Sequence, residues 1–214
     1  MDPLTARPEV DPLRLAVLAS GRGSNLEAIL AACRREGFPA RVVVVVSDRE
    51  HAPALERATR EGVAAVFVDP KAYGDRAAYD GALLATLEPY QPGLVCLAGF
   101  MRLLTPTFVD AWAGRLLNIH PSLLPAFPGL HPQRQAIEYG VKVAGATVHF
   151  VDGGIDTGPV ILQASVLVRS DDTEDSLAAR ILVEEHRLYP EAIRLFAEGR
   201  LAITGRRVVA KESP

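Results

Sequence analysis

Residues 13–46 read LRLAVLASGRGSNLEAILAACRREGFPARVVVVV, and this stretch decides the fold. Its opening residues, LRLAVL, are typical of a buried strand, which breaks at the turn Ser20–Gly23. The β-branched run at 41–46 is too continuous to leave one face in water, so it is typical of a strand inside a parallel sheet. Between the two strands, apolar residues recur at the spacing of an amphipathic helix, namely Leu26, Ile29, Leu30 and Cys33. The stretch therefore predicts a strand–helix–strand unit.

The same alternation continues to about residue 120. We expect a helix opening at Pro53, a strand at 64–68, a helix from Asp75 to about residue 87, a strand at 94–98, a short helix from Thr105–Pro106 and a strand at 115–119. Four consecutive strand–helix repeats predict an α/β fold with a doubly wound, mainly parallel sheet, Rossmann-like in its N-terminal half. Ligands in such sheets bind beyond the carboxyl ends of the strands, where Gly21, Phe100 and His120 fall.

The C-terminal third has a different and irregular pattern. Two strands are expected at 144–151 and 159–168, and Thr173 is expected to cap a long C-terminal helix that Pro190 kinks or restarts. Residues 201–209 can form a small hairpin around Gly205. We therefore expect a tail at 1–12, a single domain at 13–204, and a C-terminal tail or short hairpin at 205–214.

Composition excludes several classes of function. The chain has 214 residues, of which 49% are apolar and 23% charged, which is ordinary for a globular protein. A net charge of −3 without a dense Lys/Arg block gives no electrostatic case for a nucleic-acid partner. No signal peptide or apolar run of roughly 18 residues is present, so we expect no membrane partner and a cytoplasmic location. Cys33 and Cys96 lack metal-ligand spacing, so we expect reduced packing residues and no metal site.

The segment from Gly114 to His131, GRLLNIHPSLLPAFPGLH, carries the first chemical motif. Asn118 and His120 are two residues apart at the end of an expected strand, so their side chains leave on the same face. The loop that follows is stiffened by prolines, at Pro121, Pro125 and Pro128. A neutral donor beside a group that titrates near neutral pH suits chemistry that forms an oxyanion and moves a proton. The alternative is a buried Asn–His pair that only ties down a loop.

A glycine-rich turn, Ser20–Asn25, joins the first strand to the first helix. The N–H groups at a helix start converge on one point, which makes a phosphate cradle. Leu26 stands where a dinucleotide fingerprint needs its third glycine, and no Gly-Lys-Ser/Thr follows, so the turn fits a monophosphate. The alternative is a tight turn in which Ser24 or Asn25 is the N-cap.

A second glycine-rich loop, Asp152–Gly158, carries two carboxylates. If it folds over the carboxyl edge of the sheet, Asp152 or Asp156 can reach His120 and raise the pKa of its imidazole. The alternative is that both are ordinary turn-forming residues. The residues alone do not decide between the two carboxylates.

At 97–102, LAGFMR, unpaired backbone groups after Gly99 are flanked by apolar side chains. Such groups can hold a flat heteroaromatic ring by its edges. The alternative is that Phe100 and Met101 simply complete the core.

Five segments, in order and spacing, carry a family resemblance: SGRGSN, LAGFMRLL, GRLLNIHPSLLPAFPGLH, VHFVDGGIDTGPVILQ and EEHRLYP. Over roughly residues 15–199 the chain resembles the phosphoribosylglycinamide formyltransferases of purine biosynthesis. HPSLLP and the later Asp-Thr-Gly-Pro segment are shared by the wider group of folate-dependent formyltransferases.

The resemblance implies roles for particular residues. It implies the catalytic trio Asn118, His120 and Asp156, and so favours Asp156 over Asp152. It implies that the phosphoribosylglycinamide is bound by Gly23, Ser24, Asn25 and Glu185, and the folate by Arg76, Met101, Arg102, Leu103, Leu104 and Asn118. His131 and His149 lie in matching segments as loop supports, whereas His51 is expected on the surface.

The resemblance also implies the reaction. The expected activity transfers the formyl group of 10-formyltetrahydrofolate to the amine of 5′-phosphoribosylglycinamide, giving N-formylglycinamide ribonucleotide and tetrahydrofolate in de novo purine (IMP) biosynthesis. Small-molecule substrates are then the partners, no cofactor is tightly bound, and the chain is a monomer or homodimer. One alternative is a formyltetrahydrofolate hydrolase. Others are a nicotinamide-dependent dehydrogenase with Asp48 on the ribose, and a non-catalytic module that binds a phosphate ligand.

Overall fold

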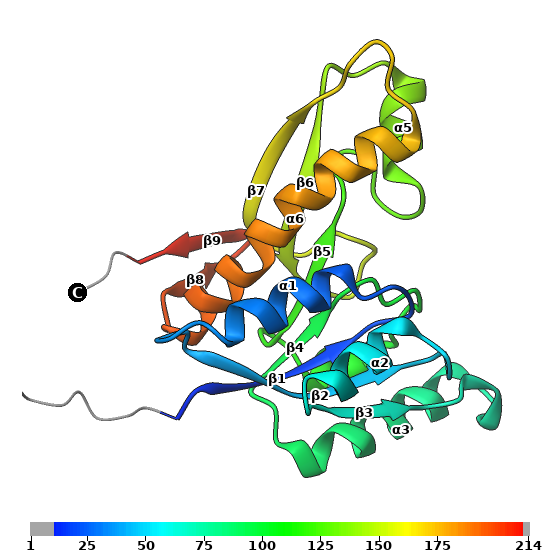
Figure 1. The fold of residues 1–214 in the computed structure, drawn as a ribbon, viewed down its shortest axis with the longest axis vertical. Coiled ribbons are helices and arrows are strands. Elements are labelled where there is room, and N and C mark those ends of the chain that lie inside the picture. The colour runs from blue at the N-terminus through cyan, green and yellow to red at the C-terminus, as the bar shows by residue number, and fades with distance from the viewer. Residues whose placement is uncertain (1–10, 212–214) are drawn as a thin grey trace, which may run out of the picture.

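A computed structural model describes residues 11–211 of the chain. Within this range a single sheet has the strand order β3-β2-β1-β4-β5-β6-β7-β9-β8 (Figure 1). The strands are β1 (Leu13–Leu18), β2 (Ala40–Ser47), β3 (Ala64–Phe67), β4 (Leu94–Leu97), β5 (Leu116–His120), β6 (Val143–Phe150), β7 (Val160–Leu167), β8 (Leu201–Thr204) and β9 (Arg207–Ala210).

The helices are α1 (Ser24–Cys33), α2 (Pro53–Arg60), α3 (Arg76–Leu87), α4 (Pro106–Ala111), α5 (Pro132–Tyr139) and α6 (Glu174–Ala197), with 3-10 turns η1 (Pro70–Ala72) and η2 (Glu88–Tyr90). Asp75 caps α3 and Thr173 caps α6, as the sequence predicts. The helix α5 is absent from the sequence-based expectation. Its boundary signals are nevertheless present, because Pro132 stands at its start and Gly140 follows its end.

The predicted α/β fold with a mainly parallel sheet is confirmed. β1 to β5 pair in parallel, whereas β6 runs antiparallel to β5 and β7 antiparallel to β6. The C-terminal third therefore extends the sheet in mixed orientation. The expected hairpin around Gly205 is also confirmed, because β8 and β9 pair antiparallel at the end of the sheet.

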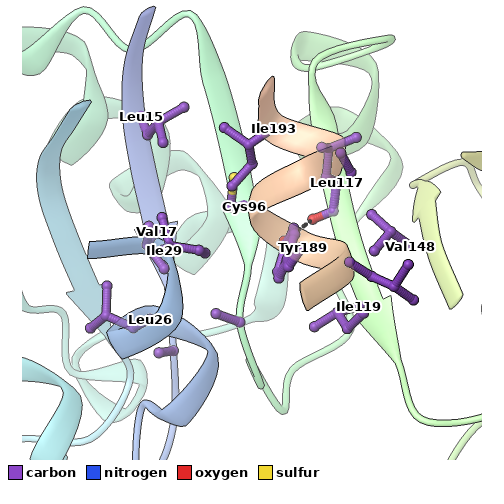
Figure 2. Close-up of a cluster of buried hydrophobic side chains, with 14 of the residues drawn as sticks. Leu15, Val17, Leu26, Ile29, Cys96, Leu117, Ile119, Val148, Tyr189 and Ile193 are labelled. Atoms are coloured by element: carbon purple, nitrogen blue, oxygen red, sulfur yellow. Dashed lines mark hydrogen bonds between the residues drawn. The ribbon is translucent and has the colours of Figure 1, made fainter. Parts of the chain in front are cut away.

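Helices cover both faces of the sheet. Alternate residues of β1 enter different clusters: Leu15 and Val17 pack with α1, α2 and α6, whereas Ala16 and Leu18 pack with α3 and α4. Figure 2 shows the first cluster, in which residues of β1, β4 and β5 meet α1 and α6. Strands buried on both faces account for the continuous apolar runs of the sequence.

The long helix α6 continues through Pro190 rather than restarting there, so the prediction of a restart is wrong. A proline inside a helix removes one backbone hydrogen bond and costs about 3 kcal/mol. Here the surrounding residues are fully or almost fully buried, among them Leu188, Tyr189, Ala192 and Ile193. Packing of this face on the sheet offsets the loss at the proline.

Of the expected tail at 1–12, residues 1–10 lie outside the described residues. Within residues 11–211, no helix combines the length and apolar character that crossing a membrane requires.

Candidate active site

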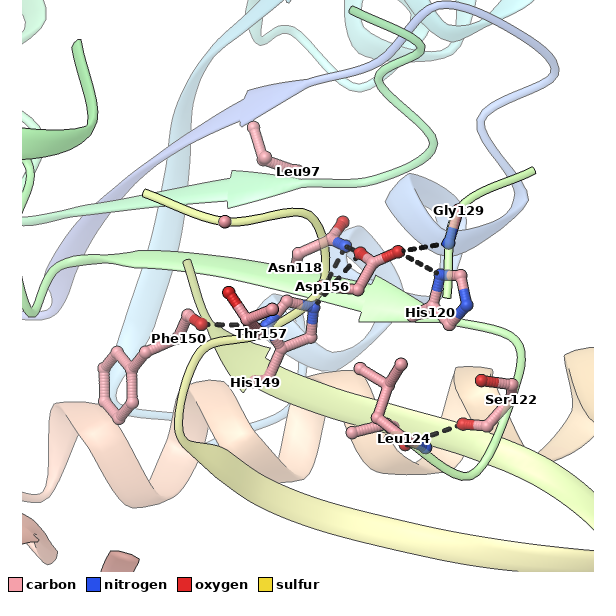
Figure 3. A network of polar contacts seen from close by, with 12 residues as sticks. Leu97, Asn118, His120, Ser122, Leu124, Gly129, His149, Phe150, Asp156 and Thr157 are labelled. Atoms are coloured by element: carbon pink, nitrogen blue, oxygen red, sulfur yellow. Dashed lines mark hydrogen bonds and ion pairs between the residues drawn. The ribbon is translucent and has the colours of Figure 1, made fainter. Parts of the chain in front are cut away.

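Asn118 and His120 lie at the end of β5, the last strand of the parallel run β1 to β5, at the carboxyl edge of the sheet (Figure 3). The loop that follows is fastened to β6 by Thr147, whose hydroxyl donates to the Ser122 carbonyl at 2.6 Å and accepts from the Leu124 N–H at 3.1 Å. These bonds hold the loop on both sides of its first turn, so the direction in which His120 leaves the strand is fixed.

Asp156 reaches the pair from the loop between β6 and β7. Its Oδ2 lies 3.3 Å from Nδ1 of His120 and accepts a hydrogen bond of 2.8 Å from the Gly129 N–H. Its Oδ1 lies 3.4 Å from Nδ2 of Asn118. Asp152 instead accepts from Gly154 and from the Thr157 hydroxyl, and so shapes the loop from within. The structure brings Asp156, and not Asp152, to His120.

His149 is the group that sequence reasoning treated only as a loop support. It lies opposite Asn118 in the β5–β6 register and is almost fully buried. Its Nδ1 donates to the Phe150 carbonyl at 2.8 Å, and its Nε2 lies 3.2 Å from Nδ2 of Asn118. The ring therefore orients the Asn118 amide. The available sequence signal is the spacing of Thr147 and His149, which places two polar side chains on one face of a buried strand.

Burial lowers the pKa of His120 below its ordinary value, because desolvation of the imidazolium outweighs the opposite effects of the Phe127 carbonyl and the Asp156 carboxylate. The expectation of a raised pKa is therefore wrong in its net direction, although Asp156 acts with the expected sign. Burial raises the pKa of Asp156, but hydrogen bonds from the His149 ring and the Gly129 N–H lower it by more. The pKa of Asp156 therefore lies below its ordinary value. At neutral pH the site holds a carboxylate beside a largely neutral imidazole.

The two ring nitrogens of His120 have different surroundings. Nδ1 faces Asp156, and Nε2 lies 2.9 Å from the Phe127 carbonyl oxygen. Of the two N–H bonds of Asn118, one points to Nε2 of His149, while the other has only the long contact to Asp156. The Asn118 amide thus keeps a donor that a reacting oxygen can use.

The turn before α1 is built around Gly23, which is the N-cap and has a left-handed φ of 72°. Because the N-cap is a glycine, which has no side chain to accept from the helix start, the alternative of Ser24 or Asn25 as the N-cap is wrong. The turn is fastened to α2, since Gly21 O accepts from the Ala54 N–H at 3.3 Å. The first N–H groups of α1 lack intrahelical partners by geometry and can bind an anion.

Asn25 instead joins the turn to α6. Its Nδ2 donates to Oε2 of Glu185 at 2.6 Å, across 160 positions of sequence. Burial raises the pKa of Glu185, and the bond from Asn25 offsets only part of that effect. Within the described part of the chain, Oδ1 of Asn25 is buried without a hydrogen-bond partner. A buried acid and an unpaired amide oxygen beside the turn can both accept hydrogen bonds from a polar ligand.

The segment 99–104 follows β4, the strand that pairs with β1. Met101 and Leu103 are exposed, so the alternative that Met101 completes the core is wrong, although Phe100 is partly buried. The Arg102 guanidinium stacks 5.0 Å from the centre of the Tyr79 ring, with Nη1 3.8 Å from Oδ2 of Asp48. Leu104 is half-buried against the α3–α4 cluster.

The remaining candidates lie apart from this network. Arg76 is exposed at the start of α3, and within residues 11–211 its side chain forms no hydrogen bond or ion pair. His131 caps α5 and lies 3.6 Å from Glu174, and His51 is exposed, as predicted. Both cysteines are free thiols. Among the described residues, no three His, Cys, Asp or Glu side chains are grouped to hold a metal ion.

Residues 13–193 match the family described as formyl transferase. The chain belongs to this family. This formyl transferase is 49% identical over 189 residues to the phosphoribosylglycinamide formyltransferase of Escherichia coli, covering 88% of this chain and 89% of that protein. It also matches, at 48% identity over 193 residues, 14% of the length of the trifunctional purine biosynthetic protein adenosine-3 of Drosophila melanogaster.

Solved structures agree with this assignment. The formyl transferase superposes on a glycinamide ribonucleotide transformylase of Symbiobacterium toebii with a TM-score of 0.93 and 57% identity, covering 99% of each chain. A formyltetrahydrofolate deformylase of Pseudomonas syringae is also similar, with a TM-score of 0.87 and 26% identity over 95% of this chain and 67% of that one. The structural likeness therefore extends to a relative of different activity.

Proposed function

We propose that this formyl transferase moves the formyl group of 10-formyltetrahydrofolate to the amine of 5′-phosphoribosylglycinamide, as a step of purine biosynthesis. The observation that carries the proposal is the convergence of Asn118, His120 and Asp156 at the sheet edge that also bears the Ser20–Asn25 turn. The identity to the Escherichia coli enzyme supports it over most of both chains.

The substrate amine attacks the formyl carbon, the C=O π electrons move to oxygen, and a tetrahedral intermediate forms. The N–H of Asn118 that makes only the long 3.4 Å contact to Oδ1 of Asp156 is the donor for this oxyanion. Nε2 of His120 becomes the second donor once it has taken the proton of the attacking amine, and it lies against a carbonyl oxygen, that of Phe127, which the oxyanion would replace. Asp156 keeps Nδ1 of the ring oriented.

His120 carries the proton between the two nitrogens. A lowered pKa supports this role, because a neutral imidazole can accept the proton that the attacking amine must lose. The imidazolium formed in this way is paired with Asp156 and faces the oxyanion. When the carbon–nitrogen bond to the folate breaks, Nε2 returns the proton to the leaving nitrogen.

The binding roles divide between two segments. The N–H groups of 23–25 hold the phosphate, and Glu185 accepts from the glycinamide end of the same substrate. The segment Met101–Leu104 lines the folate site, with Arg76 as a cation that an acidic part of the folate can meet. Donor and acceptor then approach the trio from neighbouring strands, β4 and β1.

A direct assay tests the proposal. Glycinamide ribonucleotide and 10-formyltetrahydrofolate, without ATP or Mg²⁺, should release tetrahydrofolate, since the glycine turn lacks the lysine of a nucleotide-binding loop. Product that forms only from formate, ATP and Mg²⁺ would reject the reading.

The hydrolase is the second candidate, favoured by the likeness to the Pseudomonas syringae deformylase. There, water would attack in place of the amine. Release of tetrahydrofolate at an equal rate with and without glycinamide ribonucleotide would identify the hydrolase, whereas dependence on the amine identifies the transferase.

A further inference from the structure

Ser20 lies directly between the two ligand-binding segments. It is the first residue of the Ser20–Asn25 turn, lies shortly after the end of β1 at Leu18, and is 1% exposed. Its backbone N–H donates to the Gly99 carbonyl at 3.0 Å, and its Oγ accepts from the Met101 N–H at 2.8 Å. One buried serine thus holds the backbone at Gly99 and at Met101, where the segment proposed to bind the folate begins.

The rest of the turn is fastened elsewhere. Gly21 O accepts from the Ala54 N–H, Arg22 O from Nε of Arg57, and Asn25 donates to Glu185. These bonds lead to α2 and α6, whereas the bonds of Ser20 cross from β1 to the loop after β4. A displacement of the turn is therefore transmitted to the folate segment through Ser20.

Few other restraints act on Met101 itself, although Arg102 beside it is held by the Tyr79 ring and Asp48. The side chains of Met101 and Leu103 are exposed, so packing does not fix their backbone. The Met101 N–H bond to a buried hydroxyl consequently has a large share in setting the loop conformation. A neutral hydrogen bond of this kind changes an equilibrium constant by about three- to tenfold.

We propose that Ser20 is a positioning residue that couples the two substrate sites. Ordering of the turn by the phosphate of glycinamide ribonucleotide holds the Met101 N–H against Oγ of Ser20, and the folate segment keeps its binding conformation. Each substrate then strengthens binding of the other by the same factor. This inference rests on the proposed function.

The test uses a pair of ligands that cannot react. Tetrahydrofolate carries no formyl group, so its Kd can be measured by calorimetry with and without saturating glycinamide ribonucleotide. In the wild-type chain we expect the Kd to fall about fivefold when the ribonucleotide is bound. In Ser20→Ala, which keeps the backbone bond to Gly99 but loses the acceptor for Met101, the ratio should approach one.

Ser47→Ala is a matched control. Ser47 is 0% exposed at the end of the neighbouring strand β2, and its Oγ also accepts a backbone N–H, that of Arg49 at 3.1 Å. Its loss perturbs the sheet edge beside Asp48, the partner of Arg102, but leaves the bonds of Ser20 to Gly99 and Met101 in place, so the wild-type ratio should remain. A wild-type ratio of one, or an equal ratio in Ser20→Ala, overturns the proposal.

Hydrogen exchange gives a second readout that does not depend on the variant. Exchange of the Met101 amide in the wild-type chain should slow when glycinamide ribonucleotide binds, and unchanged exchange also overturns the coupling. A turnover assay distinguishes failure of the Ser20 proposal from failure of the proposed function. A wild-type chain that turns over with an unchanged binding ratio rejects only the role of Ser20, whereas one without turnover rejects the proposed function.

Discussion

Asp156 and His120 meet at 3.3 Å between Oδ2 and Nδ1, although His120 ends β5 and Asp156 lies in the loop between β6 and β7. The Gly129 N–H donates to the same Oδ2, so the carboxylate also fastens the loop that follows His120. Asp156 has a left-handed φ of 53°, a conformation that Asp and Asn tolerate better than most residues. Replacing Asp156 with Asn therefore tests the role of its charge without straining the backbone.

Replacing Asp156 with Asn should lower the pKa of His120 further, because the negative charge that favours the imidazolium is removed. If neutral His120 accepts the amine proton, kcat/KM rises with pH through the His120 pKa, which lies below its ordinary value. The midpoint of this ascending limb should move to lower pH in Asp156→Asn, and the plateau should fall at least about tenfold. A pH–rate profile of both proteins measures the two effects.

Asp152→Asn is the matched control for this change. Its carboxylate accepts from Gly154 and Thr157 within the loop, and an amide oxygen can accept the same bonds. We expect a midpoint like that of the wild type and a rate within a few-fold of it. A larger defect in Asp152→Asn than in Asp156→Asn would contradict the assignment.

Replacing His120 with Ala should reduce kcat by about 10²–10³ or more, because it removes an oxyanion donor and the proton carrier together. Steady-state kinetics, with ribonucleotide binding measured separately, would show the loss in kcat rather than in Kd. His131→Ala is the comparison, since His131 is outside the network and 61% exposed in its side chain. Activity of His120→Ala within a few-fold of wild type would remove His120 from the mechanism.

The repeated pattern of the sequence was sufficient to predict the first five strands and the helices between them, because a parallel strand buried on both faces has a continuous apolar signature. The helix α5 was missed because its first residues follow a proline-rich loop and its apolar face is short. The sequence wrongly predicts that the helix restarts at Pro190, because local propensity does not include the packing that holds the helix continuous there.

The site was predictable where its residues are close in sequence. Asn118 and His120 share a face because of strand geometry alone. The residues alone left the choice between Asp152 and Asp156 open, because it depends on how a distant loop folds back, 38 positions beyond Asn118. The contact of Asn25 with Glu185 and the place of His149 opposite Asn118 depend likewise on tertiary packing and register.

Tyr189→Phe should lower the free energy of unfolding by about 1–3 kcal/mol. The Tyr189 hydroxyl is fully buried on α6 and lies 3.0 Å from the Leu97 carbonyl oxygen and 3.1 Å from that of Leu117 (Figure 2). Its removal leaves the buried carbonyl groups of Leu97 in β4 and Leu117 in β5 with one donor fewer. Denaturant unfolding measures the change.

Tyr139→Phe provides the reference for the tyrosine on α6, because Tyr139 is 81% exposed on α5. Loss of a hydroxyl that is already in water should change stability by less than about 0.5 kcal/mol. Equal effects of the two substitutions would show that the buried hydroxyl has no net stabilising role.

Gly23→Ala should destabilise the fold by about 1–2 kcal/mol, because a left-handed φ is unfavourable for any residue with a Cβ. The added Cβ would also lie 3.0 Å from Cα of Ala54, so the turn and α2 would have to separate.

At Gly21 the added atom would meet nothing within 4 Å and no positive φ is required, so Gly21→Ala should cost less than about 0.5 kcal/mol. Urea unfolding of the pair separates backbone strain from the mere loss of a glycine. Displacement of the turn should also raise the KM for the ribonucleotide in Gly23→Ala, and through Ser20 it should weaken tetrahydrofolate binding by a smaller factor. Equal unfolding midpoints for the two variants would show that the conformation of Gly23 does not restrain this turn.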